Sequence, residues 1–272
     1  SFGRSRPLLA ARGFAGPLVH SCQPARHISA CQATSRQGEQ RVLLGSRGSI
    51  AVPLIAEAIA SESRNFQIVY IGTAKTAPRS DSDRPLKDQR KKRRWEARRK
   101  AKDFSEILNN APHTSIFMED YHGKPDELAE AIAAGFSTAE AEAEPPTRLL
   151  IVDGGNTYWL WYHAQQAQFL QVLEMVQASH PFTYVGLSAG AILAGTTCRT
   201  ADWKGWDDPS VVPSGGLTAA MEGLGLVDSA VFPHHAQEWE QLVEDRRGSL
   251  PADSGLICVG DEDVLEHAWK RR

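Results

Sequence analysis

The segment that most constrains how this chain folds is a serine flanked by small residues, between a predicted strand and a predicted helix. Residues 186–190 are Gly-Leu-Ser-Ala-Gly, preceded by the apolar stretch 182–185 and followed by the Ala-rich stretch 191–194. A strand, a G-x-S-x-G turn and a helix in this order form a nucleophile elbow, which exposes the serine Oγ above the end of a sheet. The sequence therefore predicts an α/β sheet with a reactive hydroxyl, Ser188, at one strand end, an arrangement typical of hydrolases.

Apolar stretches typical of strands alternate with stretches typical of helices from residue 41 onward. We predict strands at 41–44, 66–72, 114–118, 148–153, 182–185, 229–233 and 255–260, and helices at 50–60, 86–110, 125–136 and 157–179. This alternation predicts one α/β domain, residues 41–272, with a doubly wound, mostly parallel sheet and helices on both faces. The section 200–228 is rich in Gly, Pro, Ser and Asp, which predicts a long loop region.

Residues 1–40 differ in composition from the rest of the chain. They contain five arginines, no lysine and a single acid. This composition is typical of an organelle transit peptide, for a chloroplast or a mitochondrion, and we expect the segment to be disordered. The alternative is an untargeted N-terminal extension of a cytoplasmic protein.

A second basic segment, residues 84–102, is predicted to be helical. It contains eleven Lys or Arg against two acids, and since the net charge of the chain is −3, the residues outside both basic segments sum to −16. A run of cations can bind nucleic acid through phosphates, but it is more often a solvated helix face. We favour the solvated face, because Glu96 interrupts the run and the rest of the chain is acidic.

Other features of the sequence exclude some classes of protein. No apolar run approaches the ~20 residues of a membrane-spanning helix, so no membrane partner is expected. The four cysteines have no C-x-x-C spacing, which predicts neither a zinc site nor a disulfide framework.

A serine hydroxyl needs a base to accept its proton, and the base needs an acid to orient it. The histidines downstream of Ser188 are His234, His235 and His267. We select His234 as the base because it follows an apolar strand, which would place it at the rim of the sheet.

The acid is less well defined by the sequence. In elbow hydrolases the acid lies between the serine and the histidine in the chain. Asp202 follows soon after the predicted elbow helix and is the first choice, with Asp207 and Asp208 as alternatives.

A second glycine-containing run ends the predicted strand 148–153. Gly154 and Gly155 would let the backbone approach a substrate, and the N–H groups of Gly155 and Ala189 are candidates for an oxyanion hole. Asn156 is a candidate N-cap for the following helix and, with Gly154, a candidate substrate contact. The alternative is a tight turn followed by a capped helix.

Together the segments 152–157, 186–191 and 233–234 resemble the peptidase E and cyanophycinase family of serine peptidases. They occur in the family's order and at about its spacing, over roughly residues 41–265. The resemblance implies a fold like that of class I glutamine amidotransferases. It also implies hydrolysis of short peptides through an acyl-enzyme without metal or cofactor, with Ser188 as nucleophile and His234 as general base. The aspartyl dipeptidases have an acid in a segment like 199–202, and Asp202 matches it only after a one-residue gap.

The chain departs from the family pattern after the histidine. Aspartyl dipeptidases have an arginine there that holds the substrate's aspartyl carboxylate, whereas residues 235–240 are His-Ala-Gln-Glu-Trp-Glu. We therefore expect a small peptide substrate without assigning its side chain. The sequence is also compatible with a homodimer. The alternative functions are an esterase or acyl hydrolase with the same residues, or a nucleic-acid-binding protein that uses residues 84–102.

Overall fold

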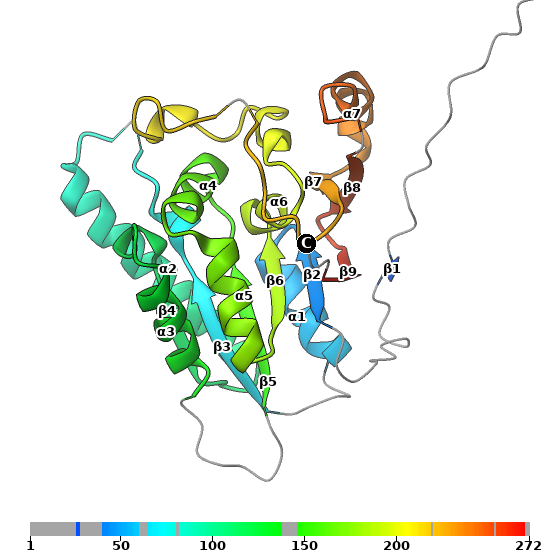
Figure 1. The fold of residues 1–272 in the computed structure, drawn as a ribbon. Coiled ribbons are helices and arrows are strands. Elements are labelled where there is room, and N and C mark those ends of the chain that lie inside the picture. The colour runs from blue at the N-terminus through cyan, green and yellow to red at the C-terminus, as the bar shows by residue number, and fades with distance from the viewer. Residues whose placement is uncertain are drawn as a thin grey trace, which may run out of the picture.

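The computed structural model describes residues 26–27, 40–59, 65–79, 82–137, 146–218, 220–252 and 254–269. Within these residues, seven strands form one sheet in the order β1-β9-β2-β6-β5-β3-β4, and β7 and β8 form a second sheet (Figure 1). The strands are β1 (Arg26–His27), β2 (Arg41–Gly45), β3 (Phe66–Ile71), β4 (His113–Ile116), β5 (Thr147–Val152), β6 (Thr183–Leu187), β7 (Ser229–His235), β8 (Gly255–Gly260) and β9 (Val264–Ala268).

Strands β2, β6, β5, β3 and β4 are parallel to one another, and β9 pairs antiparallel with β2. The helices are α1 (Gly48–Ile59), α2 (Leu86–Ile107), α3 (Pro125–Gly135), α4 (Thr157–Gln166), α5 (Phe169–Ser179), α6 (Ala189–Ala194) and α7 (Glu240–Arg247). The predicted α/β fold with a mostly parallel sheet is confirmed.

Helices cover both faces of the large sheet because successive strand side chains point to opposite faces. In β2, Val42 and Leu44 belong to the buried cluster that contains residues of α3, α4, α5 and α6, whereas Leu43 between them belongs to the cluster that contains residues of α1 and α2. The same alternation holds in β5, where Leu150 joins the first cluster and Ile151 the second. Figure 1 shows α5 in front of the sheet and α1 behind it. This burial on both faces explains why the strands are almost continuously apolar in sequence.

The structure differs from the predicted elements in three places. The predicted helix 157–179 is two helices, because Gln168 has a φ of 51° and a left-handed residue ends an α-helix. Strands β1 and β9 and helix α7 had no predicted counterpart. Strands β7 and β8 leave the large sheet and pair with each other, over a separate core that includes Phe232 and Trp203.

Of the predicted extension 1–40, only residues 26–27 and 40 belong to the described residues, so the transit-peptide prediction lies almost wholly outside them. In the described part of the chain, no helix combines the length and the apolar content needed to cross a bilayer.

Residues 86–102 of the basic segment lie in α2. The apolar side of this helix, with Ala97, Ala101 and Phe104, packs against the sheet. Arg94 also faces the body of the protein, where its guanidinium lies 3.2 Å from the Glu119 carboxylate. Other cations of the helix are exposed, among them Lys87, Arg90, Lys91, Arg98, Arg99 and Lys102. The segment is thus both a packed helix and a basic surface.

The Arg94–Glu119 ion pair provides a test of how this helix is held. The Glu119 side chain is 0% exposed, so Arg94→Met leaves a buried carboxylate without its cation. We expect this substitution to lower the free energy of unfolding by about 3–5 kcal/mol, as for other broken buried pairs. Denaturant unfolding measures the loss. The matched change Lys91→Met, on the exposed side of α2, should stay within about 0.5 kcal/mol.

If the two variants unfold at the same denaturant concentration, Arg94 does not hold α2 against the body of the protein.

Candidate active site

Three neighbouring parallel strands end at one edge of the sheet, and each is followed by a residue of the candidate site. Strand β6 lies between β2 and β5 and is hydrogen-bonded to both. Ser46 follows β2 directly, Ser188 follows β6, and Gly154 follows β5 after one further residue. The carboxyl ends of parallel strands are the usual position of sites in open α/β sheets.

Ser188 connects β6 to α6 in a strained backbone conformation, with φ 51° and ψ −108°. The glycines on either side are required by close approach. A Cβ on Gly190 would lie 2.0 Å from the carbonyl oxygen of Val152, and one on Gly186 would lie 2.7 Å from the carbonyl oxygen of Gly190. Buried Tyr184 secures the turn by donating its hydroxyl to the Gly190 carbonyl at 2.9 Å. The turn can therefore form only with glycines at these positions.

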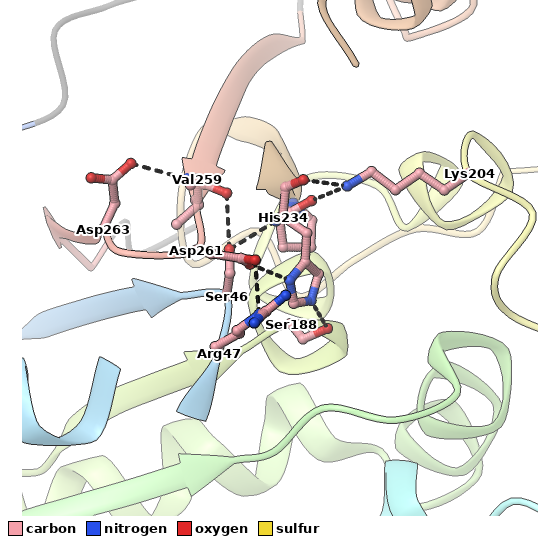
Figure 2. Close-up of polar contacts among 10 residues, drawn as sticks. Ser46, Arg47, Ser188, Lys204, His234, Val259, Asp261 and Asp263 are labelled. Carbon is pink, nitrogen blue, oxygen red and sulfur yellow. Dashed lines mark hydrogen bonds and ion pairs between the residues drawn. The ribbon is translucent and has the colours of Figure 1, made fainter. Parts of the chain in front are cut away.

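The side chains of Ser188, His234 and Asp261 form a continuous hydrogen-bonded chain (Figure 2). His234 Nε2 lies 2.9 Å from Ser188 Oγ, and His234 Nδ1 lies 2.6 Å from Asp261 Oδ1. A carboxylate at Nδ1 favours the tautomer with the proton on Nδ1, so Nε2 is left to accept the serine proton. The structure thus brings together the predicted serine and histidine.

The acid in this chain differs from the predicted one. Asp202 accepts a hydrogen bond from the Tyr158 hydroxyl, and the carboxylate at His234 belongs to Asp261. Asp261 comes after His234 in the chain, directly after β8, so the assumed order of serine, acid and histidine does not apply. The structure therefore places Asp261, and not the predicted Asp202, at His234.

The other two sequence candidates for the acid also have different partners. The Asp207 carboxylate accepts the Thr157 N–H at 2.9 Å, at the start of α4. Burial raises the pKa of Asp207, and its hydrogen bonds to Thr157 and the charge of His234 oppose that shift. The carboxylate of Asp208 accepts the N–H and the hydroxyl of Ser210. Asp207 and Asp208 thus shape the loop 203–211 rather than orient His234.

The Gly154-Gly155-Asn156 run lies beside Ser188. A Cβ on Gly154 would be 2.8 Å from Ser188 Cβ and 3.3 Å from Ser188 Oγ. Gly155 has a φ of 144°, which favours glycine, and a Cβ there would meet the Ala74 carbonyl oxygen at 2.3 Å. The backbone can therefore pass this close to the serine only without side chains.

Asn156 caps α4, as predicted, because its side-chain oxygen accepts the Trp159 N–H at 2.9 Å. Its amide nitrogen donates to the Asp208 carbonyl at 3.0 Å. Both ends of the side chain are thus engaged by the protein. Ala189 is the first residue of α6, and the first N–H groups of a helix have no acceptor within it.

Asp153, directly before the glycines, is a positioning residue that sequence analysis did not single out. Its side chain is 5% exposed; it accepts the Tyr70 hydroxyl at 2.5 Å and lies 3.2 Å from Lys75 Nζ. The other carboxylate oxygen accepts the Gly154 N–H at 2.7 Å. Burial and the Asp153 charge raise the pKa of Tyr70. The carboxylate therefore fixes the chain beside Ser188.

Further residues around His234 were also missed by sequence analysis. Arg47 Nε lies 2.8 Å from Asp261 Oδ2, the oxygen that His234 does not use. The Trp206 ring is 61% exposed and lies 5.6 Å from the His234 ring, centroid to centroid. The signal available for Asp261 was its place at the end of an apolar strand, the same signal that selected His234.

Among the described residues, no group of three or more His, Cys, Asp or Glu is placed to hold a metal ion.

Comparisons with known proteins support the fold, and a family model matches part of the sequence. The model of peptidase family S51 matches residues 144–264, which include Ser188, His234 and Asp261. This match confirms the predicted resemblance to the peptidase E family. No curated protein sequence matches the chain.

Several solved structures are similar to this one, among them the following two. A putative peptidase E protein from Listeria monocytogenes EGD-e is 17% identical, with a TM-score of 0.53 over 85% of this chain and 100% of that chain. A peptidase from an acI-B1 Actinobacterium is 18% identical, with a TM-score of 0.49 over 85% of this chain and 84% of that chain. At such identities the first of them supports the fold alone.

Proposed function

Since residues 144–264 have the sequence pattern of peptidase family S51, we propose that this chain is a serine-type peptidase that hydrolyses short peptides through an acyl-enzyme. The observation that carries the proposal is the hydrogen-bonded chain from Ser188 Oγ through His234 to Asp261. A hydroxyl, an imidazole and a carboxylate in this order can activate a nucleophile, whatever their order in the sequence.

In the first half of the reaction, Ser188 on its nucleophile elbow attacks the substrate carbonyl. His234 Nε2 takes the hydroxyl proton as the Oγ–C bond forms, and Asp261 stabilises the imidazolium and keeps Nδ1–H as its donor. His234 then gives the proton to the leaving amine as the C–N bond breaks. The second oxygen of Asp261 lies 2.8 Å from Arg47 Nε, and this ion pair helps to hold the carboxylate beside His234.

The negative oxygen of the tetrahedral intermediate needs donors beside Ser188. We assign this role to the N–H groups of Gly155 and Ala189, because the Gly154–Gly155 backbone runs beside the Ser188 side chain and Ala189 follows it at the start of α6. Fixed backbone donors at the developing oxyanion are commonly a large contribution to catalysis. In the second half, a water molecule activated by His234 attacks the acyl carbonyl and releases Ser188.

The substrate proposal is a short peptide without a required N-terminal aspartate. The cations near the site are engaged: Arg47 with Asp261, Lys75 with Asp153, and Lys204 with the carbonyls of Pro233 and His234. A substrate carboxylate would have to compete with these partners. An esterase would use the same three residues, so only the substrate separates the two functions.

The test combines a covalent probe with a substrate panel on the full chain. A fluorophosphonate probe should label the native protein, and mass spectrometry should locate the label on Ser188. A dipeptide panel that includes Asp-Xaa, Ala-Xaa and Leu-Xaa, beside simple esters, should show peptide hydrolysis without preference for Asp-Xaa. Labelling at another residue contradicts the proposed nucleophile. Ester cleavage without dipeptide cleavage establishes the esterase instead.

A further inference from the structure

His234 lies at an irregular position in its strand. The β7–β8 register shifts between Pro233 and His235: Pro233 pairs with Val259 and His235 pairs with Gly260, so His234 has no partner residue in β8. Its φ is 55°, a left-handed value that is uncommon for a residue with a side chain. A β-bulge redirects the side chain at the extra residue and leaves that residue's backbone groups outside the ladder. The bulge thus aims the imidazole at Ser188, but the backbone of His234 needs other partners.

Two side chains supply these partners, one on each side of His234 (Figure 2). The His234 N–H donates to Ser46 Oγ at 2.8 Å, and that hydroxyl donates to the Val259 carbonyl at 2.9 Å. The His234 carbonyl accepts a hydrogen bond from Lys204 Nζ at 2.5 Å, and the Pro233 carbonyl accepts one at 3.0 Å. The strained residue is therefore held at both of its backbone polar groups.

The Lys204 ammonium is itself fixed by aromatic rings. It lies 4.4 Å from the ring centroid of Phe232, 4.5 Å from that of Trp206 and 4.8 Å from that of Trp239. Cation–π attraction to three rings restricts a side chain that would otherwise move freely. Phe232 is in β7, Trp206 is in the loop before that strand, and Trp239 is in the short 3-10 helix Gln237–Trp239 after it. The ammonium therefore joins these segments at the His234 backbone.

We propose that Lys204 is a positioning residue of the peptidase reaction: its ammonium holds the bulged backbone of His234 and thereby keeps the imidazole at Ser188. This inference rests on the proposed function, because the geometry matters for catalysis only if His234 is the base. Lys204 acts through His234 and makes no contact with the reacting atoms.

The surroundings of Lys204 predict a pH dependence. Burial lowers the pKa of Lys204 from its ordinary 10.5 to about 8, opposed by the charges of Asp261, Glu238 and Cys258. The charged and titratable groups facing it are these three and His234, whose carbonyl it binds. Above about pH 8 the neutral amine loses its charge-assisted hydrogen bonds and its cation–π contacts. We therefore expect kcat to fall as the pH rises through this value.

Over the same pH range, deprotonation of Lys204 is expected to affect kcat and the free energy of unfolding in opposite directions. Between about pH 8 and 10.5 the unfolded chain still carries the Lys204 proton, whereas the folded protein has lost it. Since stability rises with pH wherever the unfolded state binds more protons, this group favours the folded state across the same interval. A fall in kcat without a fall in the free energy of unfolding is the expected signature.

The test compares three variants of the full chain. Lys204→Met keeps the length of the side chain and removes the charge and the donors. Lys204→Arg keeps a charge that is not titrated in this range. Lys100→Met is the matched control, because Lys100 Nζ also lies over an aromatic ring, 4.9 Å from the centroid of Phe104, but on α2. Thermal unfolding establishes that each variant is folded.

We expect Lys204→Met to lower kcat about 10²-fold with a smaller change in KM, since a displacement of the base by about 1 Å costs this much. The control should keep the wild-type kcat, and Lys204→Arg should move the alkaline fall to higher pH. A folded Lys204→Met variant with the wild-type kcat overturns the proposal. So does an arginine variant that still loses activity near pH 8.

A crystal structure of the Lys204→Met variant separates this inference from the proposed function. We expect the contact between His234 Nε2 and Ser188 Oγ, 2.9 Å in the wild type, to lengthen or break. This result is independent of activity, so it stands or fails even if the wild type hydrolyses no peptide. An unchanged contact overturns the positioning role of Lys204, whereas a wild type without peptidase activity overturns the proposed function alone.

Discussion

Replacing Ser188 by alanine is expected to reduce kcat for peptide hydrolysis on the order of 10⁶-fold, the size of the effect in serine peptidases. Alanine removes the only atom that can form the acyl-enzyme and leaves the turn intact, because Ser188 Oγ contacts His234 and the Ser188 backbone N–H still donates to the Gly45 carbonyl at 2.9 Å. The measurement is steady-state kinetics on the dipeptide that the wild type cleaves fastest.

The matched control for this variant is Ser179→Ala, at the exposed end of α5. It should keep the wild-type kcat and KM, and both variants should unfold at the wild-type temperature. If Ser188→Ala retains the wild-type kcat, the proposed mechanism is wrong, whatever the substrate.

Asp261→Asn is expected to lower kcat about 10⁴-fold with little change in KM, as when the acid of a serine protease triad is changed to the amide. An asparagine can present its NH₂ group to His234 Nδ1, which favours the tautomer with the proton on Nε2. That tautomer cannot accept the Ser188 proton. Kinetics at several pH values should show the loss across the range in which the wild type is active.

Asp202→Asn is the control that separates the structural assignment from the sequence-based one. Asp202 lies at Tyr158 rather than at His234, so its amide should change kcat by no more than a few-fold. If Asp202→Asn proves the more damaging variant, the Asp261 contact seen here does not operate in catalysis.

The alternation of strands and helices could be predicted because it is a local property of the sequence. Buried strands such as β3 and β5 are short apolar runs, and α2 is a long polar stretch without glycine or proline inside it. The missed elements depend on distant partners. Strand β9 is short and pairs antiparallel with β2 more than 200 residues away, and nothing in its own residues specifies that partner.

The break between α4 and α5 is a second feature that local sequence does not predict. Residues 157–179 are compatible with one helix, yet Gln168 adopts a left-handed conformation and the chain turns there. The turn allows Leu160 of α4 and Val172 of α5 to be buried in one cluster. Tertiary packing therefore overrode the local preference.

The sequence by itself identified Ser188 and His234, the proposed nucleophile and base, because each is specified by its neighbours in the chain. Ser188 requires glycines two residues away on each side, and His234 follows an apolar strand and a proline. The proposed acid, Asp261, could be found only in the tertiary structure. Asp261 meets His234 through the pairing of β7 with β8 and the bulge between them, and a contact set by strand register has no local signature. Lys204, which lies in neither strand, bonds to the His234 carbonyl, and this contact too is set by the tertiary structure rather than by neighbours in the sequence.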